Sequence, residues 1–229
     1  MTTPPKLLCR GLSLLGLPPE GRLADALALY LAEIEAWNPA YGLVGATGDE
    51  LIVKHVLDSL APLSILRAEL ARTAEGRSLS PGFGLAPPRM RIADLGTGAG
   101  LPGIPLALAL PETEVSLIDR MGKRIRFLES QKALLRLDNA EVIESEVERA
   151  RGSYDLVTFR AFRPFERKLF KSVFALCESD GVVFAYKGRK DKAEAELSEI
   201  EGLYSSVRIL PVQVPFLEDE RCIVALSPA

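Results

Sequence analysis

Three glycines at alternate positions are the residues whose type and spacing most directly suggest chemistry. Gly96, Gly98 and Gly100 follow Asp94 in the run DLGTGAGLPG. Glycine lets a chain turn with a positive φ and lets backbone approach a ligand closely, because it has no Cβ. Pro102 suits the first turn of a following helix. The run therefore predicts a tight turn between a strand and a helix that holds a small molecule against its backbone.

Asp94 and Asp119 indicate which small molecule this is. The glycines also match the GxGxxG pattern of dinucleotide-binding proteins, and Asp119 follows at the distance of an acid that binds the NAD ribose. However, Asp94 would lie poorly beside a pyrophosphate, which binds backbone N–H groups at a helix N-terminus. It suits the cationic end of S-adenosylmethionine, which carries an ammonium and a sulfonium. The residues favour this methyl donor, with Asp119 on its ribose, and leave NAD and a purely structural turn as weaker alternatives.

A parallel sheet is needed to position these residues, and the chain from residue 91 is patterned for one. Short apolar runs alternate with helix-length segments, which is typical of βαβ units. Ligands of such sheets bind at the carboxyl ends of the strands. The predicted strands are 91–95, 114–118, 140–143, 154–159 and 182–187, the helices are 102–110, 122–136, 164–176 and 191–202, and 207–214 and 222–226 should form an antiparallel hairpin at one edge.

The part before the sheet has a different pattern. Residues 1–71 carry apolar side chains at spacings of three and four, which predicts a helical extension with a turn at Asn38 and Pro39. Residues 72–89 are rich in Gly, Pro and Ser and predict a linker or mobile loop. We therefore expect an α/β protein with a helical extension, a linker and a core of residues 90–229.

The composition excludes several classes of protein. The chain has 229 residues, 48% of them hydrophobic and 26% charged, enough for a sizeable core in one large domain or in a core with a small appendage. It has one His and three Cys without CxxC spacing, so a site with two His ligands is impossible within one chain and we expect no metal. There is no apolar run of membrane-spanning length and no apolar segment of a signal peptide at the start. We expect a cytoplasmic monomer with no membrane partner.

The net charge at first disfavours a nucleic-acid partner. It is −3, with a pI of about 5.5, whereas nucleic-acid-binding domains are usually basic. The charge is segregated, however: residues 120–136 carry six basic residues against one acid, and residues 160–192 carry nine against four. An RNA partner is therefore compatible with the sequence, with a salt-sensitive affinity.

Four blocks of residues, in the same order, resemble the bacterial 16S rRNA guanine-N(7) methyltransferases, the RsmG or GidB family. The glycine block is shared by many methyltransferases, whereas the first block is much more specific. The resemblance implies a class I, Rossmann-like methyltransferase fold with a seven-stranded, mostly parallel sheet. It also implies methyl transfer from S-adenosylmethionine to a guanine N(7) near the decoding centre, in 16S rRNA or the small ribosomal subunit. The blocks are KHVLDS (54–59), DLGTGAGLPGIPL (94–106), GKRIRFL (122–128), and RAF (160–162) with KG (187–188).

The resemblance also implies which residues hold the donor. Carried over by position, it places contacts at Gly96 and Leu101 in the turn, at Val147 and Glu148 after the third strand, and at Arg160 after the fourth. Combined with the turn residues and the two acids above, the expected donor site is Asp94, Gly96, Thr97, Gly98, Gly100, Leu101, Asp119, Val147, Glu148 and Arg160.

Cations after strand ends or in loops at the same edge are candidates for RNA contact. The implied role of His55 is weaker: His55 and Asp58 lie three apart on one helix face and could order the helices over the donor. Phe162 and Phe165 could stack on a base, and core packing is an equal alternative for each ring. The candidates for contact with RNA are Arg160, Arg163, Lys187, Arg221 and His55.

A neutral guanine carries a free lone pair on N(7), so this transfer needs no general base, and we assign none. Three positions depart from the family pattern: residues 42–44, Glu146 and Cys222. Glu146 puts negative charge where the family often has a basic residue, which makes the RNA target less secure than the donor. The alternatives are a methyltransferase acting on another RNA base or a small molecule, and a non-catalytic rRNA-binding protein of the same fold.

Overall fold

One mixed sheet organises the chain in the computed structural model, which describes residues 3–78, 89–161 and 163–229. In the described part, seven strands lie in the order β3-β2-β1-β4-β5-β7-β6. Neighbours among the first five strands of the chain pair in parallel, whereas β7 is antiparallel to both β5 and β6. The mostly parallel sheet with a C-terminal hairpin is therefore confirmed. The strands are β1 (Arg91–Leu95), β2 (Glu114–Asp119), β3 (Ala140–Glu144), β4 (Tyr154–Arg160), β5 (Cys177–Lys187), β6 (Tyr204–Val212) and β7 (Arg221–Pro228).

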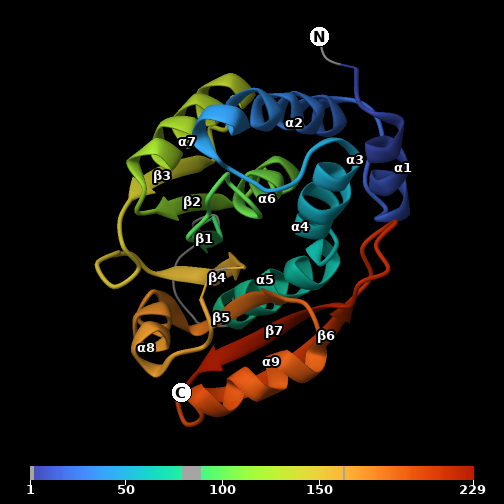
Figure 1. Cartoon of the computed structure of the whole chain (residues 1–229). Coiled ribbons are helices and arrows are strands. Elements are labelled where there is room, and N and C mark those ends of the chain that lie inside the picture. The colour runs from blue at the N-terminus through green and yellow to red at the C-terminus, as the bar shows by residue number, and fades with distance from the viewer. Residues whose placement is uncertain (1–2, 79–88, 162) are drawn as a thin grey trace.

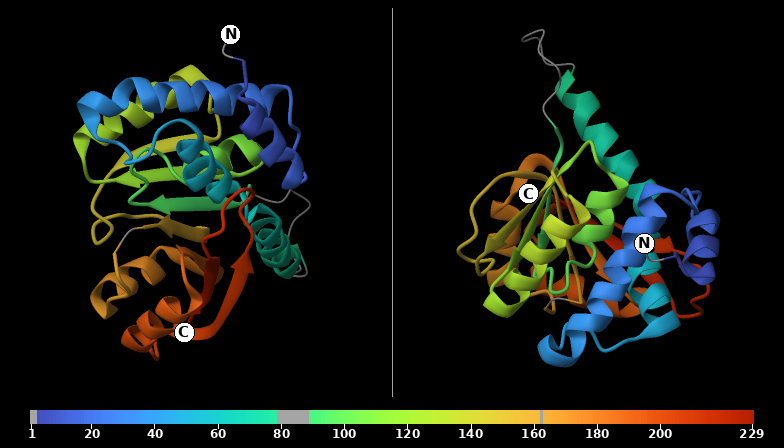
Figure 2. Two further views of the ribbon diagram at one scale, coloured as in Figure 1. Left: turned by 45° about the vertical axis from the view of Figure 1, so that its right-hand side comes forward. Right: turned by 90° about the horizontal axis from the view of Figure 1, so that it is seen from above.

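Helices cover both faces of the sheet, as Figures 1 and 2 show. The N-terminal helices pack with α6 and α7 on one face, and the last helices pack on the other. The first group is α1 (Lys6–Leu14), α2 (Arg22–Tyr41), α3 (Gly48–Leu51), the π-helix η1 (Ile52–Leu57), α4 (Asp58–Leu60), α5 (Leu63–Ser78), α6 (Gly103–Ala109) and α7 (Gly122–Leu135); the second is α8 (Arg167–Ala175), α9 (Lys190–Leu197) and the 3₁₀ turn η2 (Ser198–Ile200).

Strand residues alternate between the two cores. In β4, Leu156 joins the core under the N-terminal helices and Val157 joins the core under α8 and α9. In β5, Phe184 and Val183 divide in the same way. Strands buried on both faces read as continuous apolar runs, which is why the sequence pattern located them. The N-terminal helices share one core with the sheet, so their positions are fixed relative to the strand ends.

The predicted turn at Asn38 and Pro39 is wrong, because α2 continues through both residues. The helix ends at Gly42, which has a φ of 56°. Oδ1 of Asn38 accepts hydrogen bonds from the backbone N–H groups of Leu43 (2.7 Å) and Val44 (3.0 Å), and so closes the loop that follows. Pro39 lies in the last turn of the helix, where its missing N–H removes one hydrogen bond.

The predicted linker starts too early, because α5 continues to Ser78 and residues 72–78 are helical. Glu69 in the preceding turn is 5% exposed. It pairs with Arg72 and, at 2.8 Å, with Arg208 of β6, so this part of the helix is fixed to the sheet. The polar residues after it extend the helix rather than starting a linker. Residues 79–88 of the predicted linker, and the stacking prediction for Phe162, lie outside the described residues.

Candidate active site

The glycine-rich turn joins β1 to α6 at the carboxyl end of the parallel strands (Figure 1). Gly96, Gly98 and Gly100 have φ values of 64°, 62° and 92°, the region that favours glycine. Gly100 has a second reason to lack a side chain, since an added Cβ would lie 2.4 Å from Cδ1 of Ile104. The predicted tight turn is confirmed.

Asp94 holds this turn through hydrogen bonds to Thr97 and Gly103. Its side chain is fully buried, and its Oδ2 accepts hydrogen bonds from Oγ1 of Thr97 (2.5 Å) and from the backbone N–H of Gly103 (2.7 Å). Its Oδ1 is buried and has no hydrogen-bond partner among the described residues. Burial raises the pKa of Asp94 to about 7. Asp94 and Thr97 thus shape the turn, and their contact with the donor stays a prediction.

Asp119 ties the end of β2 to the same turn. Its Oδ2 accepts a hydrogen bond from the backbone N–H of Gly98 at 2.9 Å, and its Oδ1 accepts one from the N–H of Met121 at 2.9 Å. Nη1 of Arg124 also donates to Oδ2, at 3.2 Å. A carboxylate offers about four acceptor positions. Three are used by the protein and one is left, and the contact of this buried carboxylate with a ribose hydroxyl stays a prediction.

A cleft of about 630 Å³ lies beside the turn, and we call it the donor cleft. Its lining includes Gly96, Asp119, Val147 and Glu148, four residues predicted to hold the donor. The volume lies within the ordinary range of small-molecule sites, about 300–1,000 Å³. These residues therefore fit S-adenosylmethionine. The lining does not include Asp94, Thr97, Gly98, Gly100, Leu101 or Arg160, and their donor contacts stay predictions.

Two charged pairs line the donor cleft. Nη2 of Arg163 donates to Oε1 of Glu148 at 2.7 Å, which holds the pKa of Glu148 below its ordinary value. Arg163, which is predicted to contact RNA, is therefore hydrogen-bonded to Glu148, which is predicted to contact the donor. Glu146 also lines the cleft and lies 3.7 Å from Nε of Arg149 on the exposed surface. Its charge departs from the family pattern but is partly balanced by this neighbour.

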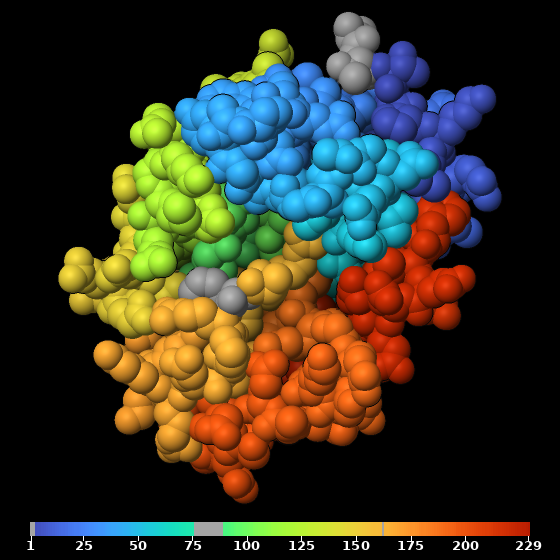
Figure 3. Space-filling model, viewed as in Figure 1, coloured from blue at the N-terminus to red at the C-terminus, as the bar shows by residue number. Residues whose placement is uncertain are grey.

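A second cavity of about 490 Å³ adjoins the first, and Ala161 lines both. We call it the arginine cavity, because Arg160 and Arg221 are in its lining together with His55 and Asp58. In Figure 3 it opens as a recess between the N-terminal helices and the C-terminal hairpin. The fold thus brings four segments that are distant in the sequence together around this cavity. They are η1 with α4, the last residues of β4, the last residues of β5 and the first residues of β7.

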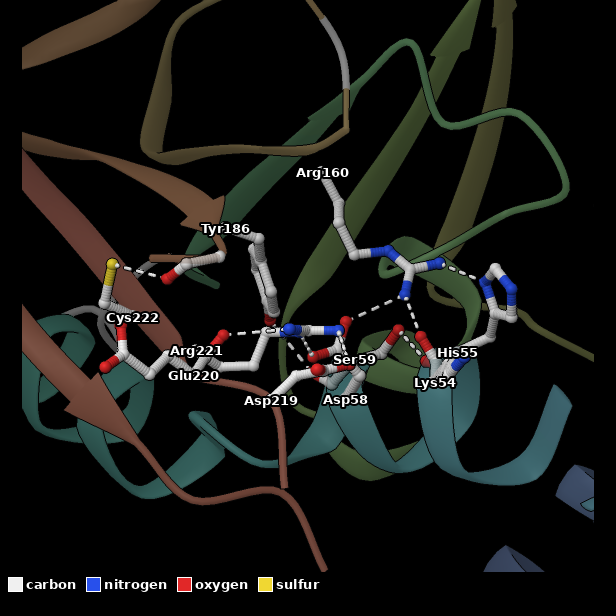
Figure 4. A network of polar contacts seen from close by, with 11 residues as sticks. Lys54, His55, Asp58, Ser59, Arg160, Tyr186, Asp219, Glu220, Arg221 and Cys222 are labelled. Carbon is white, nitrogen blue, oxygen red and sulfur yellow. Dashed lines mark hydrogen bonds and ion pairs between the residues drawn. The ribbon is translucent and has the colours of Figure 1, made fainter. Parts of the chain in front are cut away.

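Arg160 is held by three groups from the N-terminal helices (Figure 4). Its Nη1 donates to the carbonyl of Lys54 (2.9 Å) and to Oδ2 of Asp58 (2.9 Å), and its Nη2 lies 2.9 Å from Nδ1 of His55. Nε of Arg221 donates to Oδ1 of Asp58 at 3.2 Å. The Asp58 carboxylate therefore bridges an arginine of β4 and an arginine of β7.

His55 is expected to stay neutral at physiological pH. Burial, together with the Arg160 guanidinium, lowers the pKa of His55 to about 4. The ring then accepts the Arg160 hydrogen bond at Nδ1 and carries its proton on Nε2. Because His55 is the single histidine of the chain, its ring signals in a ¹⁵N–¹H NMR spectrum need no assignment. We expect the Nε2–H tautomer and no titration between pH 5 and 8; a midpoint near the ordinary value of about 6.5 would contradict this geometry.

Lys187 and Phe165 are engaged with each other. Nζ of Lys187 donates to Oε2 of Glu196 at 2.6 Å and lies 4.0 Å from the centre of the Phe165 ring. Phe165 is 1% exposed and packs against the rings of Phe159 and Phe170. The stacking prediction for Phe165 is therefore wrong, because a core ring cannot meet a base. Lys187 lines the arginine cavity, and its RNA contact stays a prediction.

The described residues show neither a helix suited to crossing a membrane nor a group of three or more acidic, His or Cys side chains suited to a metal ion. The three cysteines are free thiols. Burial raises the pKa of Cys177 to about 12 and also raises that of Cys222. The thiols of Cys177 and Cys222 are therefore protonated and weakly nucleophilic at neutral pH.

The strand order, the glycine turn and the adjoining cleft define a class I, S-adenosylmethionine-dependent methyltransferase. A solved structure with the same fold is "magnesium protoporphyrin IX methyltransferase (ChlM) from Synechocystis PCC 6803 with bound SAM". The match has a TM-score of 0.54 and 14% sequence identity, and it covers 86% of this chain and 97% of that one. This likeness shows the fold, and the family follows from the sequence comparisons.

Residues 77–224 match the family model GidB, described as rRNA small subunit methyltransferase G. The "Ribosomal RNA small subunit methyltransferase G" of Treponema denticola is 37% identical over 240 residues, 96% of this chain and 93% of that protein. The protein of the same name from Verminephrobacter eiseniae is 36% identical over 213 residues, 90% of this chain and 86% of that protein. The chain belongs to the rRNA small subunit methyltransferase G (GidB) family. The family resemblance and S-adenosylmethionine as methyl donor are thereby confirmed.

Proposed function

We propose that this protein methylates N(7) of a guanine in 16S ribosomal RNA, near the decoding centre of the small subunit. Family membership supports a ribosomal RNA substrate. The observation that carries the proposal is that the donor cleft and the arginine cavity adjoin at Ala161. A donor in one and an extruded base in the other would meet at this residue. We expect a cytoplasmic monomer that acts on rRNA or on the small subunit.

The residues of the arginine cavity suit an acceptor that needs no deprotonation. S-adenosylmethionine supplies an electrophilic methyl group, and the guanine N(7) lone pair can attack it directly. His55, the single imidazole of the chain, is engaged through Nδ1 with Arg160 and is not free to act as a base there. Catalysis then comes mainly from positioning, which can contribute about 7–11 kcal/mol when the geometry is good.

The charge balance of this cavity fits the same reaction. Positive charge develops on guanine during the transfer, so an unbalanced guanidinium pressed on the ring would oppose it. Asp58 lies between Arg160 and Arg221 and offsets one of their two positive charges. An arginine has five N–H donors, and among the described residues Arg160 uses three of them, in its contacts with Lys54, Asp58 and His55. The other two can hydrogen-bond the guanine carbonyl oxygen O6 without blocking N(7).

The rim of the donor cleft supports contact with an RNA backbone. Arg120 and Lys168 are exposed and line the cleft together with Arg124 and Arg163. These four residues belong to the two basic segments of the sequence, residues 120–136 and 160–192. Phosphate contacts of this kind give affinity that falls with salt. We therefore expect weak binding to naked RNA and stronger binding where the folded RNA adds shape recognition.

The proposal is tested by mapping modified nucleosides of 16S rRNA from cells that lack the protein. We expect mass spectrometry to show the loss of one 7-methylguanosine, which returns when the wild-type gene is restored. If every guanine-N(7) methylation of 16S rRNA stays intact, the proposal is wrong. Loss of a different methylated nucleoside would favour the alternative of another RNA base.

A further inference from the structure

We infer that Tyr30 of α2 is a positioning residue for the methyl donor, because its hydroxyl fixes the glycine-rich turn. The inference rests on the donor site of the proposed function and extends it to the N-terminal helices. Tyr30 is fully buried, and its hydroxyl donates to the backbone carbonyl of Ala99 at 2.6 Å. The two residues are 69 positions apart, so this hydrogen bond joins the extension directly to the turn.

The carbonyl of Ala99 lies in the glycine-rich part of the turn. Ala99 stands between Gly98 and Gly100, which both have positive φ and little intrinsic conformational preference. The start of the turn is fixed by the carbonyl of Ile118, which accepts hydrogen bonds from the N–H groups of Gly96 and Thr97. Asp94 accepts hydrogen bonds from the Thr97 hydroxyl and from the N–H of Gly103. Among the described residues, the Tyr30 hydroxyl is the one hydrogen-bond donor to the Ala99 carbonyl. It therefore fixes the peptide group between Ala99 and Gly100 from outside the turn, together with the hydrogen bond inside the turn from the N–H of Gly100 to the carbonyl of Thr97 at 2.9 Å.

Tyr30 is itself held rigidly. Burial raises the pKa of its phenol well above the ordinary value, so the hydroxyl stays protonated and donates at any pH of interest. The helix that carries it is fixed farther along by Trp37, whose ring contacts that of Phe127 of α7 edge-on at 5.5 Å. The donor cleft is lined by Gly96 at the start of the turn and by Asp119, which binds Gly98. A shift of the turn would therefore reach the donor.

Tyr30→Phe removes this hydrogen bond and leaves the ring in place. Thr113→Val is a matched control, because Thr113 is 3% exposed and its hydroxyl donates to the carbonyl of Leu110 at 2.9 Å. Thr113 immediately precedes β2, at the opposite end of the sheet from the turn. Both variants lose one buried hydroxyl that binds a backbone carbonyl, so we expect similar decreases in thermal midpoint.

The two variants should differ in donor affinity measured by calorimetry with S-adenosylmethionine. For Tyr30→Phe we expect Kd and the donor KM to rise about tenfold, with kcat at saturating donor within about twofold of wild type. For Thr113→Val we expect Kd to be unchanged. Amide hydrogen exchange at residues 98–100 should be faster in Tyr30→Phe only.

Three results would overturn the inference. A Kd of Tyr30→Phe within twofold of wild type would show that Tyr30 has only a structural role. Equal losses of affinity in both variants would show a general effect of destabilisation. If the wild-type protein binds no donor, the donor site of the proposed function fails together with the inference, whereas the first two results leave that site intact.

Discussion

Asp94→Asn is expected to make the folded protein more stable above pH 7 and to weaken its binding of the methyl donor. The amide oxygen can replace Oδ2 as the acceptor for Thr97 and Gly103, so both hydrogen bonds that hold the turn are kept. The amide nitrogen replaces Oδ1, which has no hydrogen-bond partner among the described residues. Removing the buried charge should add about 4 kcal/mol to the free energy of unfolding at pH 8. The buried amide N–H groups gain no acceptor among the described residues, which should cost about 2 kcal/mol, so we expect a net gain of about 2 kcal/mol.

The gain in stability should depend on pH in a defined direction. Folded Asp94 keeps its proton up to about pH 7, whereas the unfolded chain releases it near the ordinary value of 3.8. The stability that wild-type Asp94 contributes is therefore full below about pH 4 and lost as the pH rises to about 7. Relative to Asp94→Asn, the wild type should lose about 1.4 kcal/mol per pH unit in that window. His55, with its lowered pKa, destabilises both proteins as the pH falls below its ordinary value, so its effect cancels in the comparison.

Donor affinity should change in the opposite sense. The ammonium and sulfonium of S-adenosylmethionine are attracted by a carboxylate beneath the turn, and losing that charge should raise Kd about tenfold. Calorimetry at pH 8 measures Kd, and urea unfolding measures stability on the same samples. Asp94→Ala is the comparison: it leaves Thr97 and Gly103 without their acceptor, so it should lose stability. Unchanged donor affinity in Asp94→Asn would show that Asp94 serves the turn alone.

Asp58→Ala is expected to have the largest effect on the arginine cavity. Asp58 is 6% exposed and is the carboxylate partner that Arg160 and Arg221 share. Its removal leaves two partly buried guanidinium groups without that partner, which should cost about 3 kcal/mol of stability. The side chain of Arg160 should then shift from its place beside Ala161. Because misplacement of about 1 Å can cost about 100-fold in rate, we expect a loss of that order in methyl transfer at saturating donor.

Glu50→Ala is the control for this variant. Glu50 precedes Asp58 in the same run of helices and pairs with Lys54 four residues later, with side chains that are 50% and 44% exposed. Exposed pairs of this kind contribute little because water screens them, so stability and rate should stay near wild type. Methyl transfer by Asp58→Ala within threefold of wild type would contradict the role given to the shared carboxylate.

The sequence predicted those parts of the fold whose signals are local. The run at β1 is apolar and ends in glycines, so both the strand and the turn could be located from neighbouring residues. The start of β5 could not be located, because Glu178 to Asp180 are polar and precede Gly181, a pattern typical of a turn. In the structure, the β4–β5 pairing shifts register between Tyr154 and Leu156, and this irregularity has no local sequence signal.

The donor site was more predictable than the arginine cavity for the same reason. Asp119 could be placed because strand ends meet at one edge of a parallel sheet. The partners of Arg160 are 102–106 residues away and lie partly on a π-helix, which the helical periodicity does not reveal. The sequence pattern predicted Tyr30 only as one apolar residue on a face of the N-terminal helices. The signal that was available is that a buried tyrosine hydroxyl usually has a hydrogen-bond partner.

The central claim is most directly tested with the purified protein and S-adenosylmethionine labelled with deuterium in its methyl group. The substrate is small ribosomal subunits from cells that lack the protein, and the product is digested to nucleosides for mass spectrometry. We predict that the label enters 7-methylguanosine of 16S rRNA, at about one methyl group per subunit. Label in any other nucleoside, or none in the rRNA, would contradict the account.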